Sequence, residues 1–155
     1  MRRLVVAIAS GGFVGYIPVV PATFGSLWGI PLFWCVSKLP PWAWALAVLA
    51  TVGASCWVAE RAEEYFGEKD SSKIVVDEIA GYLVTTLWLP FGAFHAAVAF
   101  VAFRFFDIVK IFPARSIDRS VPGGLGVVLD DVVSGVYANL FTRLFLLLWV
   151  RGGTG

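Results

Sequence analysis

The 155-residue sequence is poor in the residues that build disulfides, zinc sites and nucleic-acid-binding surfaces. It has one histidine and two cysteines, Cys35 and Cys56, and neither cysteine belongs to a CxxC or Cys/His spacing. A disulfide or zinc site therefore has little support, and we expect both cysteines to be buried in apolar packing. The net charge is +1, and the carboxylates are mixed with lysine and arginine, so the chain has no basic face. We therefore expect no nucleic-acid partner.

Charge is also missing from long stretches of the chain. No charged residue lies between Arg3 and Lys38, and all eleven acidic residues fall in two acidic islands, residues 60–78 and 104–131. A soluble domain spreads charge of both signs over its surface, whereas a membrane protein keeps ionisable groups where water or a partner reaches them. The chain has 59% hydrophobic residues, seven tryptophans and a mean hydropathy of +0.81. It is therefore expected to be embedded in a membrane.

The length of the chain limits its organisation. At 155 residues we expect one domain, residues 1–155, which is too short for a catalytic domain plus a separate anchor. The sequence thus predicts an all-α, compact, membrane-embedded helical bundle with short or re-entrant helices and a polar site facing the cytoplasm. It does not define the oligomeric state.

Two uncharged or nearly uncharged runs predict long membrane helices. Residues 42–59 are an uncharged run of about 18 residues, and at ~1.5 Å per residue they cover most of a ~30 Å hydrocarbon core. Residues 132–150 predict a final apolar helix that contains Arg143. Glycine and proline between residues 11 and 31 predict an irregular entry, followed by a short helix from about Ser26.

Residues 79–103 carry no formal charge and form either one tilted span or a bent hairpin of two short helices. One crossing would separate the acidic islands, whereas a hairpin would keep them on the same face of the membrane. With the hairpin, Arg2, Arg3 and the seven basic residues of the islands all lie on one side. Such a bias is typical of the cytoplasmic side. We therefore predict the hairpin, with both islands facing the cytoplasm.

Two acidic pairs, Asp77-Glu78 and Asp130-Asp131, each stand directly before an apolar run. Buried carboxylate pairs repel each other unless a cation lies between them, and hard oxygen ligands suit Mg²⁺ with phosphate completing its shell. Asp77-Glu78 suits helix N-capping equally well. The acids from residue 60 to 68 are interpreted as a solvated helical turn. Phosphate chemistry at a magnesium site is the leading hypothesis for the two pairs.

Several side chains near the acidic pairs are expected to support this site. Lys73, Arg104 and Lys110 are natural partners for phosphate oxygens. Arg104, Asp107 and Lys110 are spaced by three and form a polar stripe on a helix, which an intrahelical ion pair would also explain. His95 lies in an apolar segment and is interpreted as a packed or interfacial residue. Glycines 81 and 135 each follow an acidic pair, and they predict close helix packing near the site.

Four blocks of this sequence resemble the phosphatidylglycerophosphatase A family. They are residues 21–26 (PATFGS), 74–81 (IVVDEIAG), 103–110 (FRFFDIVK) and 123–135 (GGLGVVLDDVVSG). Their order and spacing match the family over nearly the whole chain. The chain departs from the family at Ala22, Ile111 and Pro122, where glycine, proline and often histidine are usual. Pro122 implies that no histidine of that loop is needed as an acid or base.

The resemblance implies a magnesium-dependent phosphatase that spans the bacterial inner (cytoplasmic) membrane several times, with its active site on the cytoplasmic face. Its substrate would be phosphatidylglycerophosphate, which it would convert to phosphatidylglycerol during phospholipid biosynthesis, with the lipid tails remaining among the membrane lipids. One or two Mg²⁺ ions would be bound by Asp77, Glu78, Asp130 and Asp131, and Asp107 would complete the catalytic acids. The phosphate would be held by Lys73, Arg104, Lys110, Thr23 and Ser26. Thr23 and Ser26 also suit capping of the following helix.

Three rival functions make different demands on the sequence. Histidine-dependent lipid phosphatases need at least two catalytic histidines and are excluded by the single histidine. A phosphatidyltransferase-like lipid enzyme would also gather acids and magnesium at a membrane face, but its acid-rich motif is missing. A non-enzymatic membrane scaffold or transport subunit gives no reason for two acidic pairs.

Overall fold

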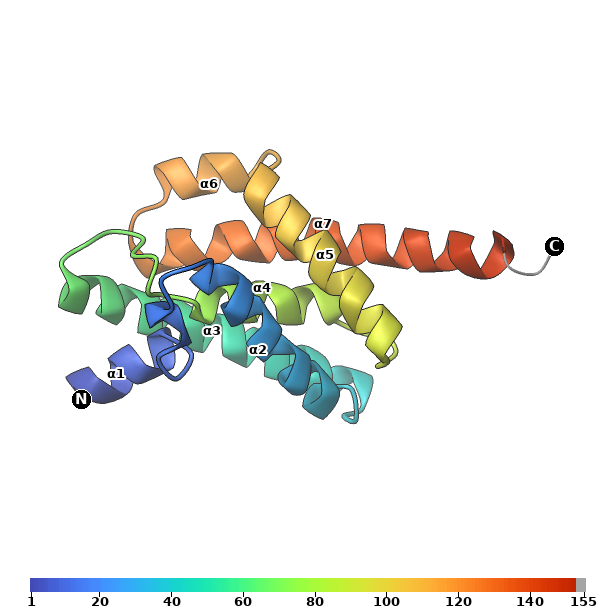
Figure 1. Ribbon diagram of the computed structural model, residues 1–155, viewed down its shortest axis with the longest axis horizontal. Helices are drawn as coiled ribbons and strands as arrows, with labels where there is room; N and C mark the ends of the chain where they lie inside the picture. Colours follow the sequence, from blue (N-terminus) through green and yellow to red (C-terminus); the bar gives the residue numbers. More distant parts are fainter. Residues whose placement is uncertain (153–155) are drawn as a thin grey trace.

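The computed structural model describes residues 1–152, and within this range the chain is helical and contains no strand (Figure 1). The elements are α1 (Arg2–Ala9), the 3₁₀ helix η1 (Val14–Tyr16), α2 (Pro21–Val36), α3 (Pro41–Phe66), α4 (Val76–Thr86), α5 (Ala93–Val109), α6 (Ala114–Ser120) and α7 (Gly123–Gly152). The all-α prediction is confirmed.

The helices α3 and α7 are long and apolar enough to cross a membrane, with 26 and 30 residues. Only 28% and 22% of their most apolar stretches are buried in the protein, so they are not core helices of a soluble domain. Their outer faces carry large apolar side chains such as Leu49, Leu144 and Trp149, which are 65%, 56% and 62% exposed. Continuous apolar surface of this kind is costly in water and stable against hydrocarbon. The two helices therefore indicate membrane association.

The short helix α4 lies at the centre of the bundle and packs against α7, α2 and α3. Nine of its eleven residues are buried. The hydroxyl of the fully buried Tyr82 donates a hydrogen bond to the carbonyl of Ala96 in α5, at 3.0 Å. A helix with so little exposed surface has a fixed orientation, which matters because its first turn carries Asp77 and Glu78.

Residues 79–103 form the predicted hairpin, because α4 ends at Thr86 and α5 begins at Ala93. Two polar side chains of α7 bind the carbonyl groups at this turn. Asn139 Nδ2 donates to the carbonyls of Thr85 and Leu87, at 2.7 and 3.1 Å, and an Arg143 amino group donates to Leu87 at 2.7 Å. The end of a helix that does not reach water needs such donors. These bonds explain why an arginine lies within the apolar α7.

The N-terminal third differs from its prediction. Residues 2–9 form α1, and α2 begins at Pro21 and continues through Pro31. The glycines of α2 serve close packing and do not interrupt the helix. A Cβ added at Gly25 would lie 2.7 Å from the Cβ of Val75, and one at Gly29 would collide with the ring of Tyr82.

The prediction for the cysteines is wrong for Cys35, which is exposed, and Cys56 is half-buried. Neither pairs with a second cysteine. An apolar side chain on the outer face of a membrane helix needs no burial in protein, because hydrocarbon surrounds it.

The predicted close packing at Gly81 and Gly135 is confirmed. A Cβ added at Gly135 would collide with the carbonyl oxygen of Gly81, and one at Gly81 would lie 2.6 Å from the ring of Phe103 and 2.9 Å from the carbonyl oxygen of Asp131. The crossing of α4 over α7 therefore depends on two residues without side chains, and it lies one turn from Asp77 and Glu78.

Gly135→Ala should lower the stability of the protein in detergent by about 1–3 kcal/mol, because the added methyl group forces α4 and α7 apart. Gly53→Ala is the matched control, since nothing lies within 4 Å of its added Cβ. It should leave the protein as stable as the wild type or slightly more stable, because alanine favours helix. Thermal unfolding followed by circular dichroism compares the two. Equal melting temperatures would contradict a crossing that requires glycine.

Candidate metal and phosphate site

Three carboxylates from the two acidic islands meet where α4 crosses α7. Asp77, Glu78 and Asp131 each offer one oxygen, and these oxygens all lie within 4.8 Å of one another. Asp77 and Asp131 are only 7% and 4% exposed, and Glu78 is partly buried. We call these three residues the carboxylate triad. Residues more than fifty positions apart in the sequence thus share one small volume.

The triad lacks protein partners for part of its oxygens. Oδ1 of Asp77, Oε2 of Glu78 and Oδ2 of Asp131 are enclosed and accept no hydrogen bond from the described residues. The alternative of helix capping is not supported, because α4 has Val75 at its N-cap position and no side-chain capping bond. Enclosed carboxylate oxygens without partners are costly, and a bound cation is the ordinary way to stabilise them. The triad could hold a metal ion.

Burial raises the pKa of Asp77 well above its ordinary value, and the neighbouring Glu78 raises it further. Burial also raises the pKa of Glu78, to about 8, with contributions from the charges of Asp131 and Asp107. Without a cation Glu78 holds its proton near neutral pH. A metal ion must displace that proton, so its affinity for the triad should rise with pH.

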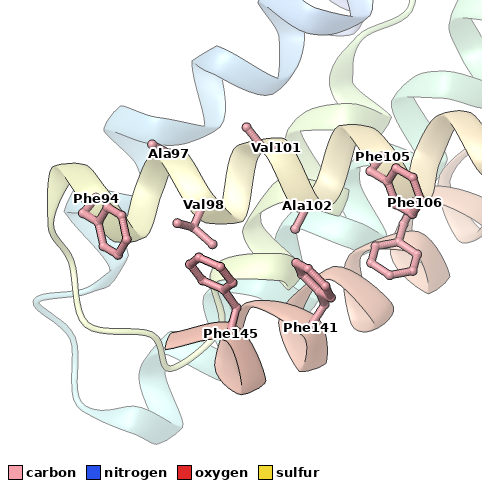
Figure 2. Close-up of a pocket in the computed structure, with 9 residues that line it drawn as sticks. All are labelled: Phe94, Ala97, Val98, Val101, Ala102, Phe105, Phe106, Phe141 and Phe145. Atoms are coloured by element: carbon pink, nitrogen blue, oxygen red, sulfur yellow. The ribbon is translucent and has the colours of Figure 1, made fainter. Parts of the chain in front are cut away.

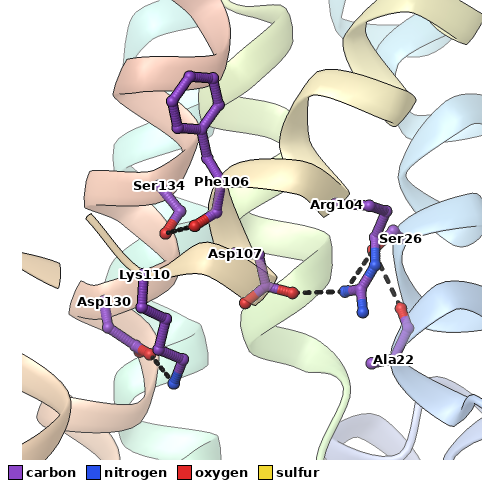
Figure 3. A network of polar contacts seen from close by, with 8 residues as sticks. All are labelled: Ala22, Ser26, Arg104, Phe106, Asp107, Lys110, Asp130 and Ser134. Atoms are coloured by element: carbon purple, nitrogen blue, oxygen red, sulfur yellow. Dashed lines mark hydrogen bonds and ion pairs between the residues drawn. The ribbon is translucent and has the colours of Figure 1, made fainter. Parts of the chain in front are cut away.

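Asp130 belongs to a different contact. Its Oδ2 accepts a hydrogen bond from Lys110 Nζ at 2.6 Å (Figure 3). The same ammonium lies 3.3 Å from Asp118 of α6. Neighbouring residues on a helix point about 100° apart, so Asp131 faces α4 while Asp130 faces Lys110. Lys110 ends α5 with a positive φ of 46°, a conformation that costs energy for a residue with a side chain. A ligand role for Asp130 stays a prediction.

Arg104 is held between two elements. Its guanidinium donates to Asp107 Oδ2 at 2.6 Å and approaches Ser26 Oγ at 3.5 Å (Figure 3). The predicted intrahelical ion pair is therefore present, and both of its side chains are more than four-fifths buried. Ser26 Oγ in turn donates to the carbonyl of Ala22, at 3.0 Å. Asp107 holds the guanidinium beside α2, where it has little freedom to rotate.

The remaining predicted phosphate ligands lie at the ends of α2 and α4. Thr23 is half-buried in the first turn of α2, whose N-cap is Val20 and which has no side-chain capping bond, so neither Thr23 nor Ser26 caps it. Lys73 precedes α4, and its ammonium lies 5.9 and 5.3 Å from the ring centres of Tyr16 and Phe66. Among residues 1–152, Lys73 forms no ion pair with a carboxylate. Its charge is available to an anion.

Glu60 has a structural contact that its sequence context did not predict. The sequence predicted that Glu60 belongs to a solvated helical turn. Its carboxylate instead accepts a hydrogen bond from the backbone N–H of Gly124, at 2.5 Å, and so holds the start of α7 against α3. A Cβ at Gly123 or Gly124 would collide with Glu60. Two features of the sequence are consistent with such a contact: the glycine pair at the start of α7 and the general preference of helix N-termini for acidic side chains. Neither feature identifies which acid is the partner.

Comparison with known proteins identifies relatives of the chain by sequence. A family model described as phosphatidylglycerophosphatase A matches residues 7–146. The chain is 35% identical to a phosphatidylglycerophosphatase A of Escherichia coli over 130 residues, which cover 83% of this chain and 76% of the relative. It is 32% identical to one of Haemophilus influenzae over 133 residues, 84% of this chain and 82% of the relative.

A third relative, from Bacteroides thetaiotaomicron, is named as a candidate phosphatidylinositol-3-phosphatase. It is 34% identical over 157 residues, with 96% of each chain covered. No solved structure matches the chain significantly.

The stability of the metal-free protein should fall as the pH rises. The pKa of Glu78 is raised from 4.5 to about 8 on folding, so the folded protein holds this proton more tightly than the unfolded chain. Its contribution is complete below pH ~4.5 and is lost as the pH rises through ~8. With chelator present, the melting temperature in detergent should fall by about 10 °C between pH ~5 and ~8.5, and MgCl₂ should reverse the fall.

Glu78→Gln should make this profile less steep, with Asp77 responsible for the remaining slope. Glu64→Gln should retain the wild-type profile, because Glu64 lies on the exposed face of α3 in an ion pair with Arg61. A wild-type profile that is flat in chelator would contradict the raised pKa of Glu78.

Proposed function

The chain belongs to the phosphatidylglycerophosphatase A family, and we propose that it hydrolyses phosphatidylglycerophosphate to phosphatidylglycerol and inorganic phosphate with Mg²⁺ as its cofactor. The family match supports the assignment as a phosphatase. The observation that supports a metal-dependent reaction is the carboxylate triad, with its enclosed and unpartnered oxygens.

The donor atoms of the triad fit Mg²⁺ by their chemistry. All are carboxylate oxygens, with no nitrogen or sulfur ligand among them. Magnesium prefers hard oxygen ligands and is commonly held by a few carboxylates together with phosphate oxygens of the substrate. When bound, Mg²⁺ would neutralise negative charge on the phosphate and so favour attack at phosphorus. Asp77, Glu78 and Asp131 would hold it, and Asp130 is a further predicted ligand.

The basic residues around the triad suit a phosphate monoester. Arg104 is held by Asp107, Lys110 is held by Asp130 and Asp118, and Lys73 lies before the first turn of α4. Each can donate charged hydrogen bonds to phosphate oxygens, and the guanidinium can donate two at once. Because carboxylates already fix Arg104 and Lys110, little side-chain freedom is lost when the substrate binds.

Hydrolysis breaks the bond between phosphorus and the oxygen of the lipid headgroup. The oxygen of water forms the new bond to phosphorus, a carboxylate of the cluster accepts the proton of the water, and the leaving oxygen gains a proton to become the hydroxyl of phosphatidylglycerol. Asp107, Asp130 and the triad are the acids available for this transfer. An aspartyl-phosphate intermediate would divide the same net reaction into two steps.

A second lipid phosphate deserves comparison because of the Bacteroides relative. Its printed name refers to a phosphate monoester on an inositol headgroup, whereas the other two names refer to phosphatidylglycerophosphate. The chemistry common to both is a phosphate monoester on a phospholipid. We propose phosphatidylglycerophosphate as the substrate, because both phosphatidylglycerophosphatases and the family model carry that description.

We further propose that residues 1–155 act as one membrane domain of the bacterial inner membrane, with the site facing the cytoplasm. In Figure 1, α1, α6, the α3–α4 loop and the start of α7 gather at one end of the bundle. These elements carry six of the twelve basic residues: Arg2, Arg3, Lys69, Lys73, Arg115 and Arg119. The opposite end has an aromatic border: Trp88 donates to the carbonyl of Pro41 at 3.0 Å, and Lys38 covers the ring of Trp34. Basic residues on one side and interfacial tryptophans are typical of this orientation.

Asp77→Asn and Asp131→Asn should each lower phosphate release from phosphatidylglycerophosphate by at least about a hundredfold, because each removes a charge expected to hold the metal. The assay uses purified protein in detergent with MgCl₂, with and without chelator, and with phosphatidylinositol 3-phosphate in parallel. Glu64→Gln is the isosteric control and should retain full activity. Melting temperatures establish that the variants are folded. Wild-type turnover that survives chelation would contradict the metal-dependent reaction, and faster release from the inositol lipid would transfer the assignment to that substrate.

Residues 70 and 115 should be accessible from the same side of the membrane. Asp70→Cys and Arg115→Cys, each in a background without Cys35 and Cys56, should react with a membrane-impermeant maleimide in inverted vesicles and not in intact spheroplasts. Both positions belong to the end of the bundle that carries the site. Labelling of the two positions from opposite sides would contradict the proposed orientation.

A further inference from the structure

A groove with a volume of about 560 Å³ runs along the outer side of the bundle between α5 and α7 (Figure 2). Every residue that lines it has an apolar side chain. Its outer side is open and continuous with the exposed apolar surface of the two helices, where Val101, Phe105 and Leu144 are each more than half exposed. It is therefore accessible from the lipid phase and offers no partner to a polar ligand.

The walls of the groove are aromatic and its floor is made of small side chains. Along α7 the rings of Phe141 and Phe145 stack with their centres 6.4 Å apart, and Phe106 of α5 continues the row, 6.0 Å from Phe141. In Figure 2, Val98 and Ala102 point from α5 into the space between the helices. Contacting rings resist rearrangement, so the groove has a defined shape.

One end of the groove adjoins the candidate site. Phe106 lies directly before Asp107, and its carbonyl accepts a hydrogen bond from Ser134 Oγ at 3.4 Å, three residues after Asp131. The same ring stacks on Tyr137 with centres 5.8 Å apart. A molecule in the groove therefore has its inner end within one helical turn of acids on both α5 and α7.

The length of the groove matches half of a bilayer. From Phe94 to Phe106 the groove follows twelve residues of α5, which at ~1.5 Å per residue is about 18 Å. One leaflet supplies about half of a ~30 Å hydrocarbon core. The groove thus extends from the polar site to about the depth that the acyl chains of one leaflet reach.

We infer that this groove binds one acyl chain of the substrate phospholipid and thereby positions the headgroup phosphate beside Arg104 and Lys110, an inference that rests on the function proposed above. An acyl chain gains little hydrophobic energy on moving from bilayer to groove, because both are apolar. The contribution of the groove is packing and position. Holding the chain fixes where the headgroup lies, and small displacements of a reacting group are costly in rate.

Val98→Trp tests this inference, because the indole fills the centre of the groove. The assay compares phosphatidylglycerophosphate carrying two oleoyl chains with the same headgroup on two hexanoyl chains, in mixed micelles at a fixed lipid fraction. The variant should lose about tenfold in kcat/KM on the long-chain lipid and stay within about twofold on the short-chain lipid. Leu49→Trp, on the outer face of α3, should change neither. Equal losses on both lipids, or no loss on the long-chain lipid, would overturn the inference.

A binding measurement tests whether the groove holds an acyl chain independently of whether the protein hydrolyses the proposed substrate. Phosphatidylglycerol with a diazirine on one acyl chain is photolysed with the purified protein, and the labelled peptides are identified by mass spectrometry. Label should concentrate in residues 93–109 and 123–152, decrease at least fivefold in Val98→Trp, and persist in Leu49→Trp. If this labelling pattern appears but the wild type hydrolyses neither lipid, the groove does bind an acyl chain and the proposed substrate is wrong. Label spread evenly over the outer faces of α2 and α3 as well would overturn the groove.

Discussion

The close approach of three enclosed carboxylates is the constraint on which the rest of this structure depends. Asp77 and Glu78 from α4 and Asp131 from α7 repel one another when charged, and burial makes that repulsion costly. The glycine crossing at Gly81 and Gly135 brings the two helices close enough for the oxygens to meet. The energy released when α4 is buried on nearly every side offsets the cost of holding these acids together, and a cation would remove much of it.

The surrounding charges are arranged so that they do not neutralise the triad. Arg104 is paired with Asp107, and Lys110 is paired with Asp130 and Asp118, so each cation already has a carboxylate outside the triad. These pairs occupy the two cations, so part of the triad oxygens is left without a cationic partner among the described residues. The same division explains why adjacent acids on one helix, Asp130 and Asp131, have different partners.

Short α4 lets the triad and the apolar outer surface share one small set of helices. At 11 residues α4 is shorter than a membrane-spanning helix, and the carbonyls of its last turn have no partner within the helix. Asn139 and Arg143 of α7 bind the carbonyls of this turn. The first turn of α4 carries the acids, while α3 and α7 present large apolar side chains on their outer faces. The groove between α5 and α7 adjoins this apolar surface.

The sequence by itself determined the helical class, the hairpin at residues 79–103 and the glycine contact of α4 with α7, and it identified the family through four blocks that resemble it. The three structural features follow from composition, periodicity and local spacing, which act over a few residues. Only the tertiary structure decided that Asp131 and not Asp130 joins the triad, that Glu60 holds the start of α7, that Ser26 contacts Arg104, and that α2 runs unbroken through Pro31. Each of these depends on which face a helix turns toward a distant neighbour. That choice is set by packing over the whole bundle, because the face that buries best is known only once all the helices are in place.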